Sequence, residues 1–299
     1  MNRSRHLALL IGVASLHLAD GAAASIGTIT LAHSASPVDG TDIKEATATC
    51  PAGSIAFSGG ATLAGLPVPY SSRFLLHQSV PLGDPPSSWY VLAQEHSPSG
   101  DPWGISSWAL CAERIDGYEL VSAVGAADSE TPKSLAVSCP AGKVPIGGGG
   151  GIYFFTSNLG LYSLLPTSTG WQVRGAERFG QAANWLVAVS VSCAPQVDVS
   201  LVDVLTTNYD GQDNFDTVSA GCPANRRYIG GGGLVEEGNA LFASGPGGLG
   251  WRAGGLRTVG IGAPTGPWFV GGRALCLLLP LFADGFESGD TSAWSATVP

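Results

Sequence analysis

The chain has 299 residues, a formal net charge of −9 and only 12% charged residues, whereas 43 of its residues are glycine. Such an acidic chain argues against nucleic acid and anionic membranes as partners, because both attract basic surfaces. Valine, threonine, glycine and aromatic residues are common, and good helix formers are scarce. This composition favours strands and turns, so we expect an all-β fold.

The N-terminus has the pattern of a secretory signal peptide. Arg3 and Arg5 precede a mostly apolar stretch, Leu7–Leu18, and Ala22–Ala24 form an A-x-A-like cleavage site. The apolar stretch is too short to span a bilayer, which needs roughly 20 residues. We therefore expect removal of residues 1–24. The mature protein would then be secreted (extracellular, at the cell surface or in the periplasm) and would have no transmembrane segment.

A motif that begins Cys-Pro-Ala and ends in glycines occurs three times, at residues 50–60, 139–151 and 222–233. Two tryptophans and a second cysteine follow each copy, and the second tryptophan always lies eight residues before that cysteine. Self-similarity of this kind indicates a repeated supersecondary unit. The expected segments are β repeats at 26–114, 115–196 and 197–280, followed by a C-terminal tail at 281–299.

The cysteine spacing also predicts the disulfides. Counting back by twos from each second cysteine leads to the second tryptophan, so both residues share the inward face of one strand. Six cysteines in an exported chain favour disulfide bonds. Bridges within each repeat are therefore expected, namely Cys50–Cys111, Cys139–Cys193 and Cys222–Cys276. The alternative joins neighbouring repeats through Cys111–Cys139 and Cys193–Cys222, with Cys50–Cys276 closing a ring.

The Cys-Pro-Ala motif reads as a turn followed by a closely packed strand. Gly53, Gly142 and Asn225 stand where the turn requires a residue that tolerates positive φ. The glycine run 147–151 could suggest a phosphate loop, but it lacks the Gly-Lys-Ser/Thr ending. We interpret the run as a place where strands approach too closely for side chains, or as a bulge.

The three repeats predict either one pseudo-threefold body, similar to a β-prism, or three small sandwiches in a row. The pattern of Cys-Pro-Ala-Gly, glycines, two tryptophans and cysteine resembles β-rich repeats of bacterial exported proteins, most of which lack an assigned activity. The resemblance covers 26–280, and the third repeat departs from it at Asn225 and Ala253. The tail segment Asp284–Trp294 resembles a C-terminal segment of Gram-negative exported proteins, which implies export or a surface role. The three Cys-Pro-Ala copies, two of which continue with glycine, resemble the Cys-Pro-x-Gly repeats of the vitelline-membrane outer-layer β-prism, which implies pseudo-threefold sheets.

Few residues suit catalysis. The mature chain would keep only His33, His77 and His96, and a serine triad would need His96 with Asp101 or Glu95. No nucleophile elbow of the G-x-S-x-G type is followed by a helix pattern. We interpret His96 as a surface residue at a strand end.

Two carboxylates, Glu95 and Glu177, occupy equivalent places in repeats 1 and 2, where repeat 3 has Arg257. Paired carboxylates can hydrolyse glycosides, but equivalent positions of different repeats are expected to lie apart. We therefore expect no catalytic residue.

Metal and ligand sites are also hard to find. Asp284, Glu287 and Asp290 offer oxygen ligands of the kind calcium prefers, but their spacing is not that of an EF-hand, and we interpret them as a solvated tail. No metal site and no cofactor are expected. The tryptophans read as core residues, with Trp108 as the best candidate for an exposed aromatic ring.

The sequence therefore favours an exported, non-catalytic structural or binding protein that contacts glycans or cell-surface material. The alternative is a secreted hydrolase acting on extracellular polymers, and the enzyme question stays open. A functional site is expected in the variable loops between Gly60 and Trp89 and in their counterparts.

Overall fold

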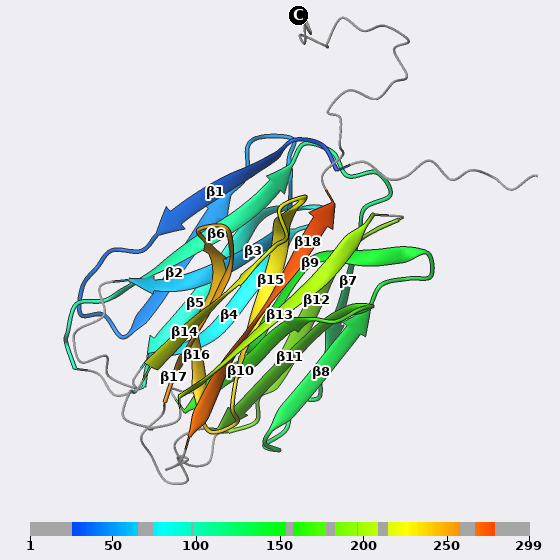
Figure 1. Ribbon diagram of the computed structural model, residues 1–299. Coiled ribbons are helices and arrows are strands. Elements are labelled where there is room, and N and C mark those ends of the chain that lie inside the picture. Colours follow the sequence, from blue (N-terminus) through cyan, green and yellow to red (C-terminus); the bar gives the residue numbers. More distant parts are fainter. Residues whose placement is uncertain are drawn as a thin grey trace, which may run out of the picture.

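The computed structural model describes residues 26–64, 74–96, 99–153, 158–177, 183–195, 197–208, 215–257 and 267–278. These residues form eighteen β-strands and no helix, which confirms the all-β prediction (Figure 1). Nowhere in these ranges is there a helix with the length and apolar character that crossing a membrane requires. The predicted signal peptide and the C-terminal tail lie outside the described residues.

Each repeat contributes six strands. Repeat 1 contains β1 (Ile29–Ala35), β2 (Ile43–Thr49), β3 (Ile55–Ala64), β4 (Phe74–Gly83), β5 (Pro86–Glu95) and β6 (Gly104–Ala112). Repeat 2 contains β7 (Glu119–Val124), β8 (Lys133–Ser138), β9 (Lys143–Tyr153), β10 (Leu159–Pro166), β11 (Gly170–Glu177) and β12 (Leu186–Pro195). Repeat 3 contains β13 (Val199–Asn208), β14 (Phe215–Gly221), β15 (Arg226–Val235), β16 (Ala240–Gly247), β17 (Gly250–Leu256) and β18 (Trp268–Leu278).

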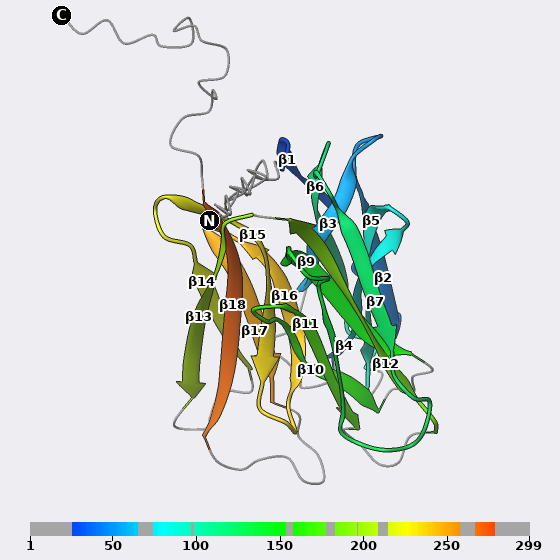
Figure 2. The ribbon, with the colours of Figure 1, turned by 90° about the vertical axis from the view of Figure 1, so that its right-hand side faces the viewer.

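The strands form three six-stranded sheets, and every sheet combines halves of two repeats. Sheet A has the order β1-β6-β3-β16-β17-β14, sheet B the order β2-β5-β4-β9-β12-β7, and sheet C the order β13-β18-β15-β10-β11-β8. Each repeat thus gives its first, sixth and third strands to one sheet and its second, fifth and fourth to another. The repeats therefore form one pseudo-threefold body, as in a β-prism, rather than three separate sandwiches (Figure 2).

Side chains pack between the two half-sheets of each repeat, and the three repeats share one hydrophobic core that contains six fully buried tryptophans. A Cβ on the central glycines would lie closer than 3.0 Å to a tryptophan ring, so only glycine fits there. The glycine–tryptophan pairs are Gly59–Trp89, Gly148–Trp171 and Gly231–Trp251. The other three tryptophans are Trp103, Trp185 and Trp268. The predicted inward face and the close packing of the glycine runs are both confirmed.

The residue before each of these glycines faces away from the tryptophans and packs against another repeat. A Cβ on Gly147 would meet the carbonyl oxygen of Phe57, and one on Gly230 would meet the hydroxyl of Ser58. Ser58, Gly147 and Gly230 are equivalent in the three repeats, and β3, β9 and β15 contact one another there. The pseudo-threefold axis therefore has room for one small side chain, that of Ser58.

Each sheet bends sharply where its two half-sheets join. We call this junction the seam; it lies between β3 and β16 in sheet A, β4 and β9 in sheet B, and β15 and β10 in sheet C. A Cβ pointing outward from Gly60, Gly149 or Gly232 would run into the backbone of the strand across the seam. In a flat sheet that Cβ would point out of the plane of the sheet and would not contact the neighbouring strand. The outer face of each sheet is therefore folded inward along its seam.

One disulfide joins the two half-sheets of each repeat. The three pairings are those predicted within repeats. The bonds are Cys50–Cys111, Cys139–Cys193 and Cys222–Cys276, with Cα–Cα distances of 5.6–5.7 Å. Gly53 and Gly142 have φ values of 84° and 80°, as the turn prediction required. Bonds of this kind suit an oxidising environment outside the cytoplasm.

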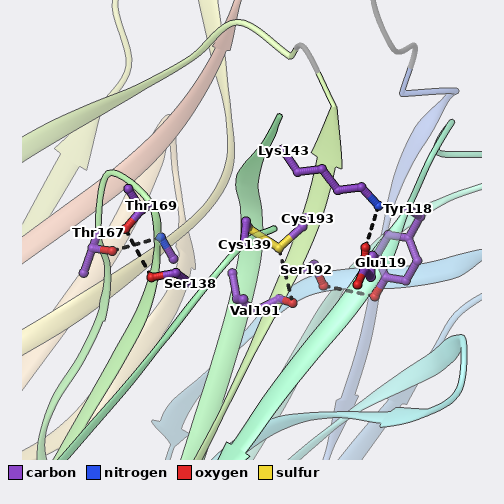
Figure 3. The surroundings of a disulfide bond; sticks show 11 residues. Tyr118, Glu119, Ser138, Cys139, Lys143, Thr167, Thr169, Val191, Ser192 and Cys193 are labelled. Carbon is purple, nitrogen blue, oxygen red and sulfur yellow. Dashed lines mark hydrogen bonds and ion pairs between the residues drawn. A yellow bond between two sulfur atoms is a disulfide. The ribbon is translucent and has the colours of Figure 1, made fainter. Parts of the chain in front are cut away.

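Polar contacts close this end of repeat 2 around its bridge (Figure 3). Lys143 Nζ lies 2.7 Å from Glu119 Oε2, and the hydroxyls of Tyr118 and Ser192 are 3.1 Å apart. Burial raises the pKa of Tyr118 to about 12. The tyrosine therefore stays neutral at physiological pH and acts as a packing group with a hydrogen-bonding tip.

Candidate functional site

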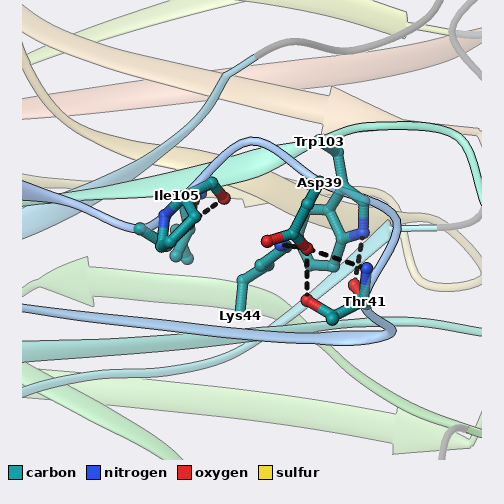
Figure 4. A network of polar contacts seen from close by, with 7 residues as sticks. Asp39, Thr41, Lys44, Trp103 and Ile105 are labelled. Carbon is teal, nitrogen blue, oxygen red and sulfur yellow. Dashed lines mark hydrogen bonds and ion pairs between the residues drawn. The ribbon is translucent and has the colours of Figure 1, made fainter.

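A buried lysine ties the β1–β2 loop to the core of repeat 1 (Figure 4). Lys44 is 2% exposed, and its Nζ donates to Asp39 and lies 5.9 Å from the centroid of the Trp103 ring. Thr41 also donates to Asp39, from its backbone nitrogen (2.9 Å) and its hydroxyl (2.7 Å). The hydrogen bond from Lys44 is the main reason that the pKa of Asp39 is held well below its usual range.

Repeat 2 has the same arrangement of lysine, aspartate and tryptophan. Lys133 Nζ donates to Asp128 and lies 5.0 Å from the centroid of the Trp185 ring. In repeat 3 Asp216 takes the position of the lysine and accepts from the hydroxyl of Thr206 at 2.9 Å. Each charge at these positions has its partner within the fold, so the arrangement is a structural tie rather than a ligand site.

The outer face of sheet A carries a pair of rings from neighbouring strands, in contact and tilted by 36° to one another. His33 on β1 pairs in register with Trp108 on β6, and their ring centroids are 4.0 Å apart. Trp108 Nε1 donates to the hydroxyl of Thr62 on β3 at 3.3 Å. Trp108 lies on the outer face as predicted, but it is half-buried rather than exposed. Its partners on the two flanking strands cover part of the ring.

The equivalent positions of the other two sheets carry different chemistry. In sheet B they are Ser122 and Ser190, whose hydroxyls are 2.8 Å apart. In sheet C they are Asp203 and Arg273, which form an ion pair with one contact of 2.9 Å. Arg273 Nη1 also donates across the seam to the carbonyl of Pro166 at 2.8 Å. A long side chain at this position therefore reaches from one half-sheet to the other.

Arg252 on β17 is an exposed cation on the second half of sheet A. A Cβ on Gly247 would meet the aliphatic stem of Arg252, so this stem lies along the outer face of β16. Besides His33, the strands of sheet A hold two charged residues, Arg252 and Asp216. Asp216 is engaged by Thr206 of sheet C. We call His33, Thr62, Trp108 and Arg252 the Trp108 surface.

A pocket of about 220 Å³ lies where repeats 2 and 3 meet, at one end of the sheet C seam. Apolar side chains form most of its wall, and two hydroxyls from the β10–β11 turn complete it. The lining residues are Val144, Pro145, Thr167, Ser168, Val199, Leu201 and Leu275. The pocket shows that a seam can leave open space, but this one offers no charged group.

Glu95, one of the residues weighed for a catalytic triad, has a structural partner in the fold. Glu95 is buried, and its Oε1 accepts from the backbone nitrogen (3.1 Å) and the hydroxyl (2.7 Å) of Ser99. Glu95 therefore ties Ser99 to the end of β5. His96 is half-buried, and Asp101 lies two residues after Ser99. Glu177 belongs to β11 of sheet C, whereas Glu95 belongs to β5 of sheet B, so the two carboxylates sit in different sheets.

His77 is the one histidine of repeat 1 in the interior. It is the extra residue of a bulge in β4, where β10 has Tyr162 and β16 has Phe242. Burial lowers the pKa of His77 to about 4, despite an opposing hydrogen bond with the backbone of Leu159. The imidazole is therefore neutral at physiological pH and fills the place of an aromatic core residue.

Several expected features fall outside the described residues. These are much of the variable loops in which a site was expected, at 65–73 and 154–157, and the tail carboxylates Asp284, Glu287 and Asp290. Across the ranges that the structure describes, no three side chains of His, Cys, Asp or Glu gather as a metal-binding group.

No protein-family model matches the chain, and no curated protein is similar to it in sequence. The candidate site therefore rests on geometry alone. Sequence reasoning singled out Trp108 but missed Arg252. The sequence did contain a signal for Arg252, because the residue after the inward first tryptophan of each repeat faces outward. These residues are Tyr90, Gln172 and Arg252.

Proposed function

We propose that this protein is an exported, non-catalytic binding module that contacts saccharide chains through the Trp108 surface. The observation that carries the proposal is the pair of contacting rings, His33 and Trp108, on an outer sheet face. The apolar face of a sugar ring can pack on such rings, while its hydroxyls bond to polar neighbours such as Thr62. The equivalent rows of sheets B and C offer no aromatic pair.

The rigidity of the surface supports a binding role. His33, Thr62 and Trp108 stand on three adjacent strands, β1, β3 and β6, which are paired over their length. The disulfide Cys50–Cys111 fixes one end of this half-sheet. A surface held in place before binding loses little conformational entropy when a ligand arrives.

Export is the second part of the proposal. Three disulfides in one chain favour an oxidising compartment. The charged and apolar N-terminal pattern of residues 1–24 agrees with a route through the secretory pathway. We therefore place the protein outside the cytoplasm, where glycans of cell walls, capsules or matrices are its natural partners.

The proposal is tested by titrating the folded protein with members of a glycan array, followed by calorimetry on those that bind. Trp108→Ala should weaken binding at least tenfold, because it removes the stacking surface. Tyr90→Ala is the matched control, since Tyr90 is a half-buried aromatic residue on the outer face of sheet B. It should leave the affinity unchanged.

Three results would contradict the proposal. The folded protein could bind no glycan on the array, or Trp108→Ala could bind as well as the wild type. Alternatively, glycan hydrolysis that Glu95→Gln abolishes would establish a secreted hydrolase instead. Circular dichroism and the melting temperature of each variant show whether the fold is retained.

A further inference from the structure

We infer that the saccharide bound at the Trp108 surface is acidic, and that Arg252 recognises its carboxylate groups. This inference rests on the proposed function above and names the ligand class of the same surface. It assigns one contact to repeat 1, through Trp108, and another to repeat 3, through Arg252. The site would then exist only because the two repeats share a sheet.

The strand register of sheet A places Trp108 and Arg252 on one row across the sheet. Trp108 pairs with Gly60 on β3, and Arg252 pairs with Gly245 on β16. A Cβ on Gly60 would collide with Gly245, so the two glycines meet at the seam. Along a flat sheet the two residues would be three strand spacings apart, or about 14 Å. The inward bend at the seam brings them closer, within reach of one short oligosaccharide.

On the strands of sheet A, the row between these two side chains is occupied by glycines at the seam. Gly60, Gly245 and Gly247 lie along the row or next to it, and none has a Cβ. In sheet C the corresponding space is bridged by Arg273, which donates to Pro166 across the seam. In sheet A, Trp108 takes the position that Arg273 has in sheet C. The cation of sheet A, Arg252, lies on the other half-sheet.

The charge pattern of the face favours an anion. The chain has a net charge of −9, yet the strands of sheet A hold one carboxylate, Asp216, which faces Thr206 of sheet C. On the outer face of these described strands, Arg252 therefore meets no competing carboxylate. The outward arginine of sheet C, Arg273, is in contrast already paired with Asp203.

A carboxylate carried on a sugar ring suits both halves of this arrangement. A guanidinium group presents its N–H donors in a planar fork, which matches the two oxygens of a carboxylate. Uronic acids carry such a carboxylate on a ring that can stack on an aromatic side chain. The predicted ligand is therefore an oligosaccharide that contains uronic acid, with one ring on Trp108 and a carboxylate at Arg252.

The test uses oligogalacturonate, alginate oligomers and hyaluronan fragments, each beside its carboxyl-reduced neutral counterpart. Calorimetry on the full mature protein should show at least one acidic form binding about tenfold more tightly than its neutral counterpart. Arg252→Gln should remove that preference, so that the acidic form binds no more tightly than its neutral counterpart. Arg174→Gln is the matched control, because Arg174 is an exposed arginine on β11 of sheet C. It should keep the preference.

The outcomes separate this inference from the proposed function. Equal binding of acidic and neutral forms, both lost in Trp108→Ala, would overturn the acidic class and leave the saccharide module standing. An equal loss in Arg252→Gln and Arg174→Gln would mean a general charge effect and would also overturn the inference. Failure of every acidic and neutral saccharide to bind the folded wild type would overturn both.

Arg252→Lys refines the result. A lysine keeps the charge but loses the planar fork. If Arg252 binds a carboxylate through two hydrogen bonds, the lysine variant should fall between the wild type and Arg252→Gln. Full retention of the preference in the lysine variant would contradict recognition by the fork.

Discussion

The three repeats have the same residue types at the central glycine and tryptophan positions of the interior, but different residue types on an equivalent row of the outer sheet faces. Inside, each repeat sets a glycine against a tryptophan, in the pairs Gly59–Trp89, Gly148–Trp171 and Gly231–Trp251. Outside, one equivalent row carries three different pairs, His33–Trp108, Ser122–Ser190 and Asp203–Arg273. Where backbones touch, only one residue type fits. Where the sheet faces solvent, each repeat is free to carry different chemistry, so a specific function is expected on the outer rows.

The largest effect should come from adding a side chain at the axis. In Gly147→Ala, the new Cβ would lie closer than 3.0 Å to the carbonyl oxygen of Phe57, which cannot rotate away. We expect a loss of at least about 4 kcal/mol in unfolding free energy, or failure to fold. Gly221→Ala is the control, because nothing lies within 4 Å of its Cβ position. Similar urea midpoints for the two variants would contradict the close packing.

The next effect concerns a covalent tie between half-sheets. The bridge Cys139–Cys193 spans 54 residues of sequence. Removing it in the double variant Cys139→Ala/Cys193→Ala should cost about 4 kcal/mol by the chain-entropy model. Urea unfolding of the oxidised wild type and of the variant measures the difference. A loss below about 1 kcal/mol would show that sheets B and C hold repeat 2 together without the bridge.

A buried histidine should make the interior sensitive to acid. The folded pKa of His77 is about 4, below its ordinary value of 6.5, so the unfolded chain binds more protons between these pH values. Stability is therefore complete above pH 6.5 and falls as the pH drops to about 4, by roughly 3 kcal/mol from this group.

His77→Phe, which copies Phe242 of repeat 3, should abolish this part of the acid sensitivity. Unfolding free energies of both proteins at pH 7, 5.5 and 4 provide the measurement. Subtracting the unfolding free energy of one protein from that of the other at each pH removes the contribution of carboxylate titration, which both proteins share. Parallel curves for the two proteins over this range would mean that His77 does not stay neutral in the fold.

The smallest effect should come from a polar residue in the core of repeat 3. Asn239 is fully buried, and neither atom of its amide has a hydrogen-bond partner. The equivalent residues are Phe74, which packs on Trp103, and Leu159. Asn239→Leu should therefore stabilise the protein by about 1 kcal/mol, because it removes an unsatisfied buried amide. A lower melting temperature than that of the wild type would contradict this view of the site.

Much of the interior could be predicted from the sequence because its signals are local. The constant step from Trp185 to Cys193 fixes one strand and its inward face, and Gly142 marks the turn after Cys139. The sharing of each repeat between two sheets has no such signal. It depends on seams with very few paired residues, such as Ser244 with Ala61.

The candidate site was harder to predict for the same reason. Trp108 has the correct face, but its burial depends on His33, which lies on a strand far away in sequence. Arg252 comes from another repeat, and it joins the surface only through the β3–β16 seam. Contacts between distant strands of this kind leave no periodic pattern that a single sequence displays.

The most direct test of the account is fluorine NMR of the protein labelled with 5-fluorotryptophan, titrated with a saccharide that binds. The chain contains eight tryptophans, six of which are fully buried in the hydrophobic core. Trp108→Phe assigns the resonance of the surface ring, and the buried tryptophans act as internal controls. The account predicts that the Trp108 resonance shifts on binding while the six core resonances stay in place. Binding with an unchanged Trp108 resonance, or with a shift in a core resonance, would contradict it.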